Sequence, residues 1–350
     1  MAVFKRILSG QTSLAATNTS TAVTVPTVDP NKCIVVLSGL RSTGGDPTNT
    51  FVGHTLSATT LTLLRSGTPA AATINWYIIE FESGVYVQRL TGTALSATPT
   101  NFTISAVDTS KTWLLATRHT TGGTFNNNDF WRKRITTATN VQFDAQAADA
   151  GSTVDTLQVI SYDGCVVTDV SDTFASGSTT LNTSVAAQDL TATLLTQTYR
   201  IDANQNMPAG MCVYAYLSTS TNLLWTRNDT FAPAALNQLV HAFLVQFNDR
   251  TRVQTVTGSM DSATTSENLA ISPVETTRAA PVPTGLDDGV WGTSAGTSAT
   301  DYSSALLAHS ITSPTVVNTQ RADTDSVAMT YAVQVAEWQV TRKSDFFLAF

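Results

Sequence analysis

Few residues in this chain have the types and spacing that catalysis needs. Glu80 and Glu82 lie two positions apart and would share one face of a strand, where two carboxylates could supply the acid and base of a glycosidase. Later copies of a repeat, described below, do not keep this pair, so we expect both side chains at an edge or on the surface. The matching positions hold Ser161 with Asp163, and Gln246 with Asn248.

Histidine, cysteine and aspartate give no nucleophile or metal-binding pattern. The histidines are scattered over different places in the repeat, and the three cysteines are too sparse for a disulfide framework and read as buried small side chains. Asp163, Asp169 and Asp172 lack the cadence of a calcium loop, and no Cys–His spacing fits zinc. We therefore predict no catalytic residue, no metal and no cofactor. The residues concerned are His54, His119, His241, His309, Cys33, Cys165 and Cys212.

Aromatic and basic residues remain as candidates for contact with a partner. Trp131 and Trp291 lie in loop-like stretches and could anchor an interface. The one basic run follows Trp131 and contains Arg132 and Arg134; it is either a solvated loop or edge-strand guard, or a contact for an acidic neighbour or a phosphate. Apolar residues on one side of the N-terminal segment could also dock onto a partner. These are Phe4, Ile7 and Leu8.

The elements that must position these residues are strands. The chain is 42% hydrophobic but only 13% charged, and Thr, Ser, Ala and Asn take the place of charged residues. Threonine is β-branched and suits a strand with a neutral outer face, whereas surface helices usually carry Glu, Lys and Arg. The composition therefore predicts an all-β fold.

A repeat of about 80 residues runs through the chain. A Thr-rich strand recurs with its key apolar residue at Leu61, Val141, Leu223 and Val316, which lie 80, 82 and 93 positions apart. Each copy continues into a loop and two apolar strands joined by a short turn. Asp163-Gly164 at one such turn is a strong hairpin signal, so we expect these strand pairs to be hairpins.

The repeat predicts tandem β-sandwich-like units, either Ig-like sandwiches or small barrels. A unit of this size is marginal alone, so stacking against neighbours or other subunits should complete its burial. The predicted boundaries are an N-terminal docking segment at 1–19, repeats at 20–93, 94–173, 174–260 and 261–350, and an inserted loop at 279–304.

Charge and hydropathy exclude several classes of function. The net charge of −7 argues against nucleic-acid binding through the overall field. No window approaches the roughly 20 apolar residues of a membrane span, and no signal-peptide pattern follows Lys5 and Arg6. We therefore expect synthesis as a soluble cytoplasmic chain.

The composition and short motifs of the chain resemble those of the tandem β domains of tailed-bacteriophage virion proteins. The resemblance rests on the Thr-rich strands, on the run Trp-Tyr-Ile-Ile-Glu-Phe at 76–81, and on Phe-Lys-Arg-Ile-Leu-Ser-Gly at 4–10, which looks like the start of some head-fibre or decoration proteins. It implies a non-enzymatic structural protein on the capsid, neck or tail, located in the virion, that forms a homo-oligomer or lattice and binds other virion proteins. It implies no catalytic residue.

Two further hypotheses stay open at this stage. A receptor-binding fibre or adhesin would recognise a host surface glycan or protein and would expose an aromatic patch around Trp291. A glycan-cleaving enzyme would need a carboxylate pair at a cleft, with Glu80 as its test position.

Overall fold

Antiparallel strands make up nearly all of the regular structure, which confirms the predicted all-β class. The computed structural model describes residues 1–42, 46–68, 70–123, 125–202, 212–227, 237–284, 306–324 and 328–339. Within these ranges the chain forms four units that repeat the same strand order. The units span 3–83, 85–162, 165–247 and 252–337. None of the short helices described has the length and hydropathy of a membrane span.

Units 1 and 2 contain the only helical turns among the described residues. Unit 1 consists of β1 (Val3–Leu14), β2 (Ser20–Thr24), η1 (Pro30–Lys32), β3 (Cys33–Ser42), α1 (Pro47–Thr50), β4 (Gly53–Leu56), β5 (Thr60–Leu64) and β6 (Ala72–Ser83). Unit 2 consists of β7 (Val85–Leu90), β8 (Thr93–Leu95), β9 (Thr100–Thr103), η2 (Thr109–Lys111), β10 (Thr112–Thr120), β11 (Arg132–Thr137), β12 (Asn140–Asp144) and β13 (Asp149–Tyr162).

Units 3 and 4 follow the same order. Unit 3 consists of β14 (Cys165–Phe174), β15 (Thr180–Ser184), β16 (Thr193–Ile201), β17 (Val213–Thr219), β18 (Asn222–Arg227) and β19 (Gln238–Phe247). Unit 4 consists of β20 (Arg252–Met260), β21 (Ser266–Ala270), β22 (Ala279–Pro283), β23 (Ala308–Ser313), β24 (Val316–Gln320) and β25 (Met329–Glu337).

Each unit is a sandwich of two small sheets. In unit 1, β6 lies between β1 and β3 in one sheet, and β5 lies between β2 and β4 in the other. The same arrangement gives β13, β19 and β25 as the central strands of the other inner sheets, and β12, β18 and β24 as those of the outer sheets. Apolar residues of the two sheets face each other, as expected for a sandwich.

The predicted hairpins are wrong. β6 and β7 are consecutive across Gly84 but do not pair; β6 pairs with β1 and β3, whereas β7 pairs with β13. The same holds at Asp163-Gly164, where β13 and β14 join different sheets. Both neighbours of the central strand are already in place, so the chain must enter a new sheet after the turn. Each unit therefore begins one strand earlier than the sequence predicts.

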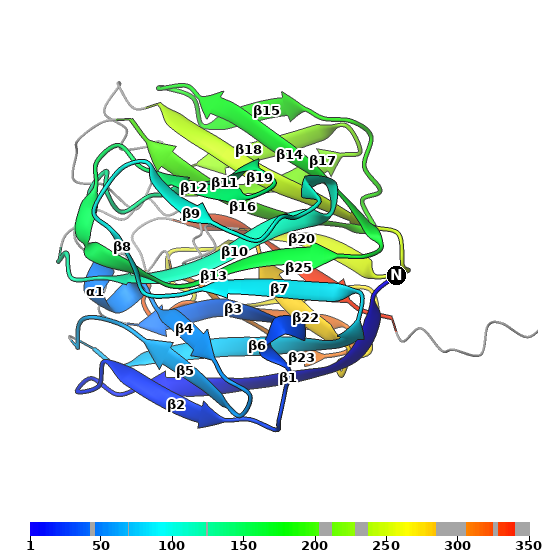
Figure 1. The fold of residues 1–350 in the computed structure, drawn as a ribbon, viewed down its shortest axis with the longest axis horizontal. Helices are drawn as coiled ribbons and strands as arrows, with labels where there is room; N and C mark the ends of the chain where they lie inside the picture. The colour runs from blue at the N-terminus through cyan, green and yellow to red at the C-terminus, as the bar shows by residue number, and fades with distance from the viewer. Residues whose placement is uncertain are drawn as a thin grey trace, which may run out of the picture.

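The turns between units gather at one end of the molecule. The backbone N–H of Ala2 donates to the carbonyl of Asp163 (2.7 Å), that of Asp163 donates to Gly84 (2.7 Å), and that of Asn248 donates to Gly164 (2.6 Å). Gly84 has φ of 75°, and a Cβ there would lie 2.6 Å from the Met1 carbonyl oxygen, so glycine is required. Figure 1 shows the N-terminus at this end, with unit 1 at the bottom, unit 3 at the top and unit 2 between them.

The four units close around a shared core. The equivalent strands β3, β10, β16 and β22 of the four units all contribute to a narrow apolar space. Its lining includes Ile34, Val36, Trp113, Leu115, Leu194, Val282, Phe247 and Trp338. The ring closes where Ala308 of β23 pairs with Gly39 of β3, which joins unit 4 to unit 1.

Equivalent glutamines bind the units together in pairs. Gln158 of β13 accepts from the N–H of Val35 (2.9 Å) and donates to its carbonyl (2.8 Å). Gln334 of β25 accepts from the N–H of Leu195 in the same way (2.9 Å). Both are about 1% exposed, and Val35 and Leu195 hold the same position in β3 and β16. Units 1 and 2 thus relate to each other as units 3 and 4 do.

A buried arginine ends the fifth strand in three of the described units. The Arg65 Nε donates to the Asn18 carbonyl, as the Arg227 Nε does to Ser178 and the Arg321 Nε does to Thr264, at 3.1, 2.8 and 2.8 Å. Each guanidinium thereby ties the loop that precedes the second strand to the outer sheet. Unit 2 has Ala145 at this position.

The segment predicted as an inserted loop begins as a strand. Residues 279–283 form β22, an edge strand that pairs with β25. The prolines in this segment suggested a loop, because proline cannot donate a backbone hydrogen bond. An edge strand tolerates proline, since one of its sides needs no N–H donor. Residues 285–304 lie outside the described ranges.

Candidate functional site

The structure places several predicted interface residues in the interior. Phe4 is 6% exposed and packs edge-on against Phe81 (6.2 Å between ring centroids), because β1 is an integral strand of unit 1 rather than a docking segment. Ile7 and Leu8 are half-buried on the same strand. Trp131 is 0% exposed and donates its Nε1–H to the Asn128 carbonyl (2.6 Å), so the expectation of an exposed ring is wrong. Trp291 lies outside the described residues.

The expected edge or surface position of Glu80 is also wrong. Its side chain is 2% exposed and binds Lys5 (2.8 Å) and Arg6 (2.7 Å) of the neighbouring strand β1. Burial raises the pKa of Glu80, but hydrogen bonds from Lys5, Arg6 and the Asp29 backbone outweigh burial and hold the pKa below its ordinary value. Glu80 therefore remains a carboxylate that holds β1 to β6.

The basic run forms β11, a strand whose successive side chains alternate between two sides. Lys133 is 1% exposed, whereas Arg132 and Arg134 lie on the opposite face, at 12% and 29% side-chain exposure. The backbone N–H of Lys133 donates to the Thr198 hydroxyl of unit 3 (3.0 Å), so β11 lies at the boundary between units 2 and 3.

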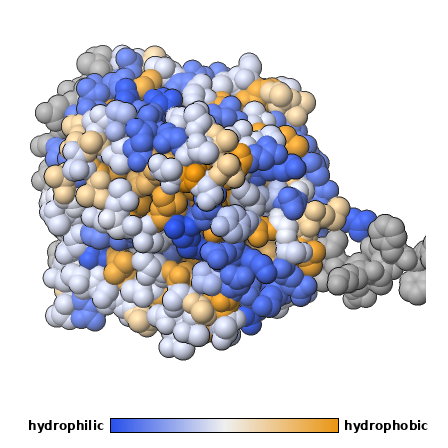
Figure 2. All heavy atoms as spheres, viewed as in Figure 1, coloured by the Kyte–Doolittle hydropathy of each residue, from blue (hydrophilic) through white to orange (hydrophobic). Residues whose placement is uncertain are grey.

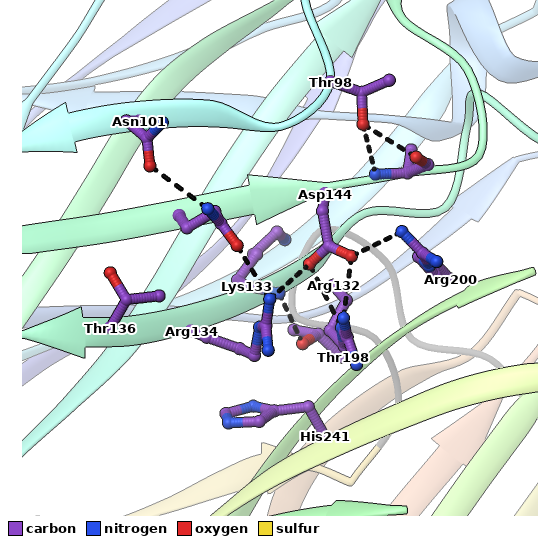
Figure 3. Close-up of polar contacts among 12 residues, drawn as sticks. Thr98, Asn101, Arg132, Lys133, Arg134, Thr136, Asp144, Thr198, Arg200 and His241 are labelled. Atoms are coloured by element: carbon purple, nitrogen blue, oxygen red, sulfur yellow. Dashed lines mark hydrogen bonds and ion pairs between the residues drawn. The ribbon is translucent and has the colours of Figure 1, made fainter. Parts of the chain in front are cut away.

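Three arginines meet at one buried carboxylate on this boundary. Arg132 binds Asp144 through two hydrogen bonds (3.1 and 2.9 Å), and Arg200 of unit 3 binds the same carboxylate (2.8 Å). Arg134 approaches Asp144 to 3.6 Å and donates to Gln142 (2.7 Å). Figure 3 shows the three guanidinium groups directed at Asp144, with His241 beside them. Burial and the charge of Arg132 lower the pKa of Arg134.

A histidine–aspartate contact lies on the unit 3 side of the same boundary. His241 is fully buried on β19, and its Nε2 lies 2.9 Å from a carboxylate oxygen of Asp169 on β14. The Asp169 side chain is 50% exposed. Its negative charge partly offsets the lowering of the Arg134 pKa. Positive and negative groups thus alternate across the boundary, which favours docking of β11 onto unit 3.

A groove of about 480 Å³ opens beside these groups. One wall comes from η2, β11 and the turn after β11, and the other comes from β14, with Phe243 of β19 beneath. Hydroxyl groups, one carboxylate and apolar side chains all contribute to its lining. The lining residues are Thr109, Ser110, Ile135, Thr136, Thr137, Ala138, Val167, Asp169 and Phe243.

The boundary between units 4 and 1 has the same strand packing, but most of the charged residues are replaced by neutral ones; the position of Arg200 keeps an arginine, Arg41. β23 packs against β3 and β6 there, as β11 packs against β16 and β19. Strand register matches Ile311 with Ile135, since they pair with Val317 and Val141. The residues that replace Arg132, Arg134, Asp144, Asp169 and His241 are Ala308, Ser310, Gln320, Ser9 and Asn75. Arg132, Arg134, Asp144 and Asp169 are therefore not required for this type of docking.

Sequence reasoning named Arg132, Arg134 and Asp169 but missed Asp144, Arg200 and the role of His241. Asp144 and Arg200 are 56 positions apart in different units, so no local pattern connects them. Alignment of the copies by strand register is the signal that could have found Asp144 and His241, because they replace the neutral Gln320 and Asn75.

Another histidine–aspartate pair lies within unit 2, where Asp155 faces Gly53 of unit 1. His119 Nδ1 is 2.7 Å from Asp155, and this hydrogen bond raises the pKa of His119. Burial raises the pKa of Asp155, because the bond from His119 compensates only in part. A Cβ on Gly53 would overlap the Asp155 carboxylate, so glycine is needed where β4 meets β13. Among the described residues, no group of three His, Cys, Asp or Glu side chains is placed to hold a metal ion.

No protein-family model matches the chain, and no curated protein sequence matches it significantly.

Proposed function

We propose that the protein is a non-enzymatic structural component of a tailed-bacteriophage virion that assembles as a homo-oligomer and binds other virion proteins. The structural role is supported by the buried ionisable and amide side chains, which bind strands and units to one another. Glu80 holds β1, Asp144 joins units 2 and 3, and Gln158 joins units 1 and 2. The phage assignment is supported only by the sequence resemblance at 4–10 and 76–81.

The exposed apolar residues offer a contact surface for such assembly. Among the described residues the exposed large hydrophobic side chains are Met1, Tyr86, Val166 and Leu190. Met1, Tyr86 and Val166 adjoin the turns that gather at one end of the molecule. On the face drawn in Figure 2, hydrophobic and hydrophilic residues are interspersed. We therefore favour this end of the molecule for contacts between copies or with other virion proteins.

Two measurements test the structural proposal. Sedimentation of the purified chain should give a concentration-dependent oligomer that the double substitution Tyr86→Ser and Val166→Ser weakens. Peptides of the chain should be found in purified particles of the source phage, and an electron cryomicroscopy map should contain the four-unit ring. A monomer at every concentration, together with absence from particles, would refute the proposal.

Recognition of a host surface is a second candidate function, and the open groove beside Asp169 favours it. Purified protein that coats host cells and blocks infection would support this function. Hydrolysis of a host polysaccharide that the Glu80→Gln variant loses would instead favour the enzymatic class, although Glu80 is buried in the structure.

A further inference from the structure

Two residues beside the groove between units 2 and 3 differ from their counterparts at the equivalent boundary of units 4 and 1. At the boundary of units 4 and 1, Asn75 donates to the His309 carbonyl (2.9 Å), and the Tyr77 hydroxyl hydrogen-bonds to the backbone of Ile311. These bonds tie β6 to β23. At the boundary of units 2 and 3 the corresponding residues are His241 and Phe243.

Neither replacement ties the strands in the same way. Phe243 lacks a hydroxyl group, and the imidazole of His241 binds Asp169. The end of β11, from Ile135 to Thr137, forms a wall of the groove. The volume of about 480 Å³ lies within the range of small-molecule sites, about 300–1,000 Å³.

The lining limits the chemistry of a ligand. Asp169 is a carboxylate acceptor held at one oxygen by His241, and its side chain is half exposed. The hydroxyl groups of Thr109, Ser110, Thr136 and Thr137 line the groove, although that of Ser110 already donates to Asp108 and that of Thr136 to the Asn140 carbonyl, so these two are left chiefly as acceptors. Ile135, Val167 and Phe243 offer apolar surface. A ligand that matches this lining has several hydroxyl groups and apolar C–H faces.

We propose that this groove binds a neutral carbohydrate, with ligand hydroxyl groups donating to Asp169. An anionic ligand is disfavoured because Asp169 lines the groove. A compact cation is disfavoured because Arg134 lies near Asp169 and offsets its charge. The inference extends the second candidate function above, but it does not depend on the structural proposal, since a virion component can bind a sugar on any surface.

Two substitutions in the full-length protein test the groove. Asp169→Asn keeps the shape of the side chain and should lower affinity about tenfold or more, the loss expected for a hydrogen bond to a charged acceptor. Ala138→Phe fills the groove from the exposed turn after β11 and should abolish binding. Ala58→Phe is its matched control, because Ala58 and Ala138 are both exposed and hold the same turn position, each accepting from a valine N–H.

The probes are an array of neutral and acidic glycans, followed by titration calorimetry with the neutral oligosaccharide that gives the strongest signal. The proposal expects binding of a neutral glycan by the native chain and by Ala58→Phe, with loss in the two groove variants. Failure of the native chain to bind any neutral glycan would overturn it. So would equal binding by Ala138→Phe, or binding of acidic glycans alone that is lost in Arg134→Gln and kept in Asp169→Asn. Oligomer formation by the same samples would leave the structural proposal standing in each case.

Discussion

Mild acid should destabilise the fold through two equivalent histidines. His54 on β4 and His309 on β23 hold the same position in units 1 and 4, contrary to the expectation that the histidines are unrelated. Both are 0% exposed, and each binds one threonine hydroxyl through Nδ1, at 3.1 Å to Thr117 and 2.9 Å to Thr319. Each Nε2 is buried without a hydrogen-bond partner.

Burial lowers the pKa of both side chains from 6.5 to about 3. Below pH 6.5 the unfolded chain takes up protons that the folded chain does not, so the free energy of unfolding falls as the pH falls from 6.5 towards 3. At pH 5 the loss is about 1.5 × 1.4, or about 2 kcal/mol for each histidine and about 4 kcal/mol for both.

His119 should act in the opposite direction. Its hydrogen bond to Asp155 raises its pKa, so its contribution to stability is fully present below pH 6.5 and is lost as the pH rises through the raised value. The lowered pKa of Glu80 supports stability that is lost only below its ordinary value of 4.5, outside the window from pH 7.5 to 5.

Urea unfolding at pH 7.5 and pH 5 measures this effect. The native chain should lose several kcal/mol between the two pH values, and the double variant His54→Gln and His309→Gln should lose about 4 kcal/mol less. His119→Gln is the control and should make the pH dependence steeper. The reasoning would be refuted if the double variant and the native chain showed the same difference between the two pH values.

Three other predictions follow from packing. Gln158→Ala and Gln334→Ala each leave a buried backbone N–H without its partner, and each should lower the free energy of unfolding by about 2–3 kcal/mol in urea titrations, with similar values because the sites are equivalent. Gly39→Ala would place a Cβ 2.0 Å from the Leu307 carbonyl and should cost about 2–4 kcal/mol, whereas Gly177→Ala, at a positive φ with open space around it, should cost less. Burial raises the pKa of Cys33 and Cys165 to about 12, so iodoacetamide at pH 8 should modify the native thiols only after unfolding; rapid alkylation of the folded chain, detected by mass spectrometry, would contradict their burial.

The sequence predicts the repeat and the strands but not their pairing. Leu61, Val141 and Leu223 are all fully buried on the central strands of the outer sheets, so the apolar pattern identified the core correctly in three units. In unit 4 the predicted Val316 is half-buried, and its neighbour Val317 holds the equivalent buried position. The turn signal at Asp163-Gly164 was ambiguous, because a glycine with positive φ serves a hairpin and a switch between sheets equally well. The strand that completes each inner sheet lies about 70 residues earlier, and no local signal identifies it.

The candidate site was predictable only in part. The alternation of Arg132 and Arg134 is visible in the sequence, but their shared carboxylate and Arg200 meet only when units 2 and 3 dock. Trp131 looked like an exposed loop residue because aromatic residues outside a strand pattern give no sign of burial. Its indole lies inside the core of unit 2.

Repetition within one chain provides an internal control for function. Positions that keep their role in equivalent units, such as Gln158 with Gln334, or Arg65 with Arg227, are explained by the shared architecture. Positions that differ between equivalent boundaries need another explanation, because β23 docks onto unit 1 with other residues at these positions. Asp169, His241 and Phe243 belong to this second class: they replace Ser9, Asn75 and Tyr77, of which Asn75 and Tyr77 bond to β23, and Asp169 and Phe243 line the groove. The part of the chain that departs from the repeat is therefore the part where a ligand should be sought.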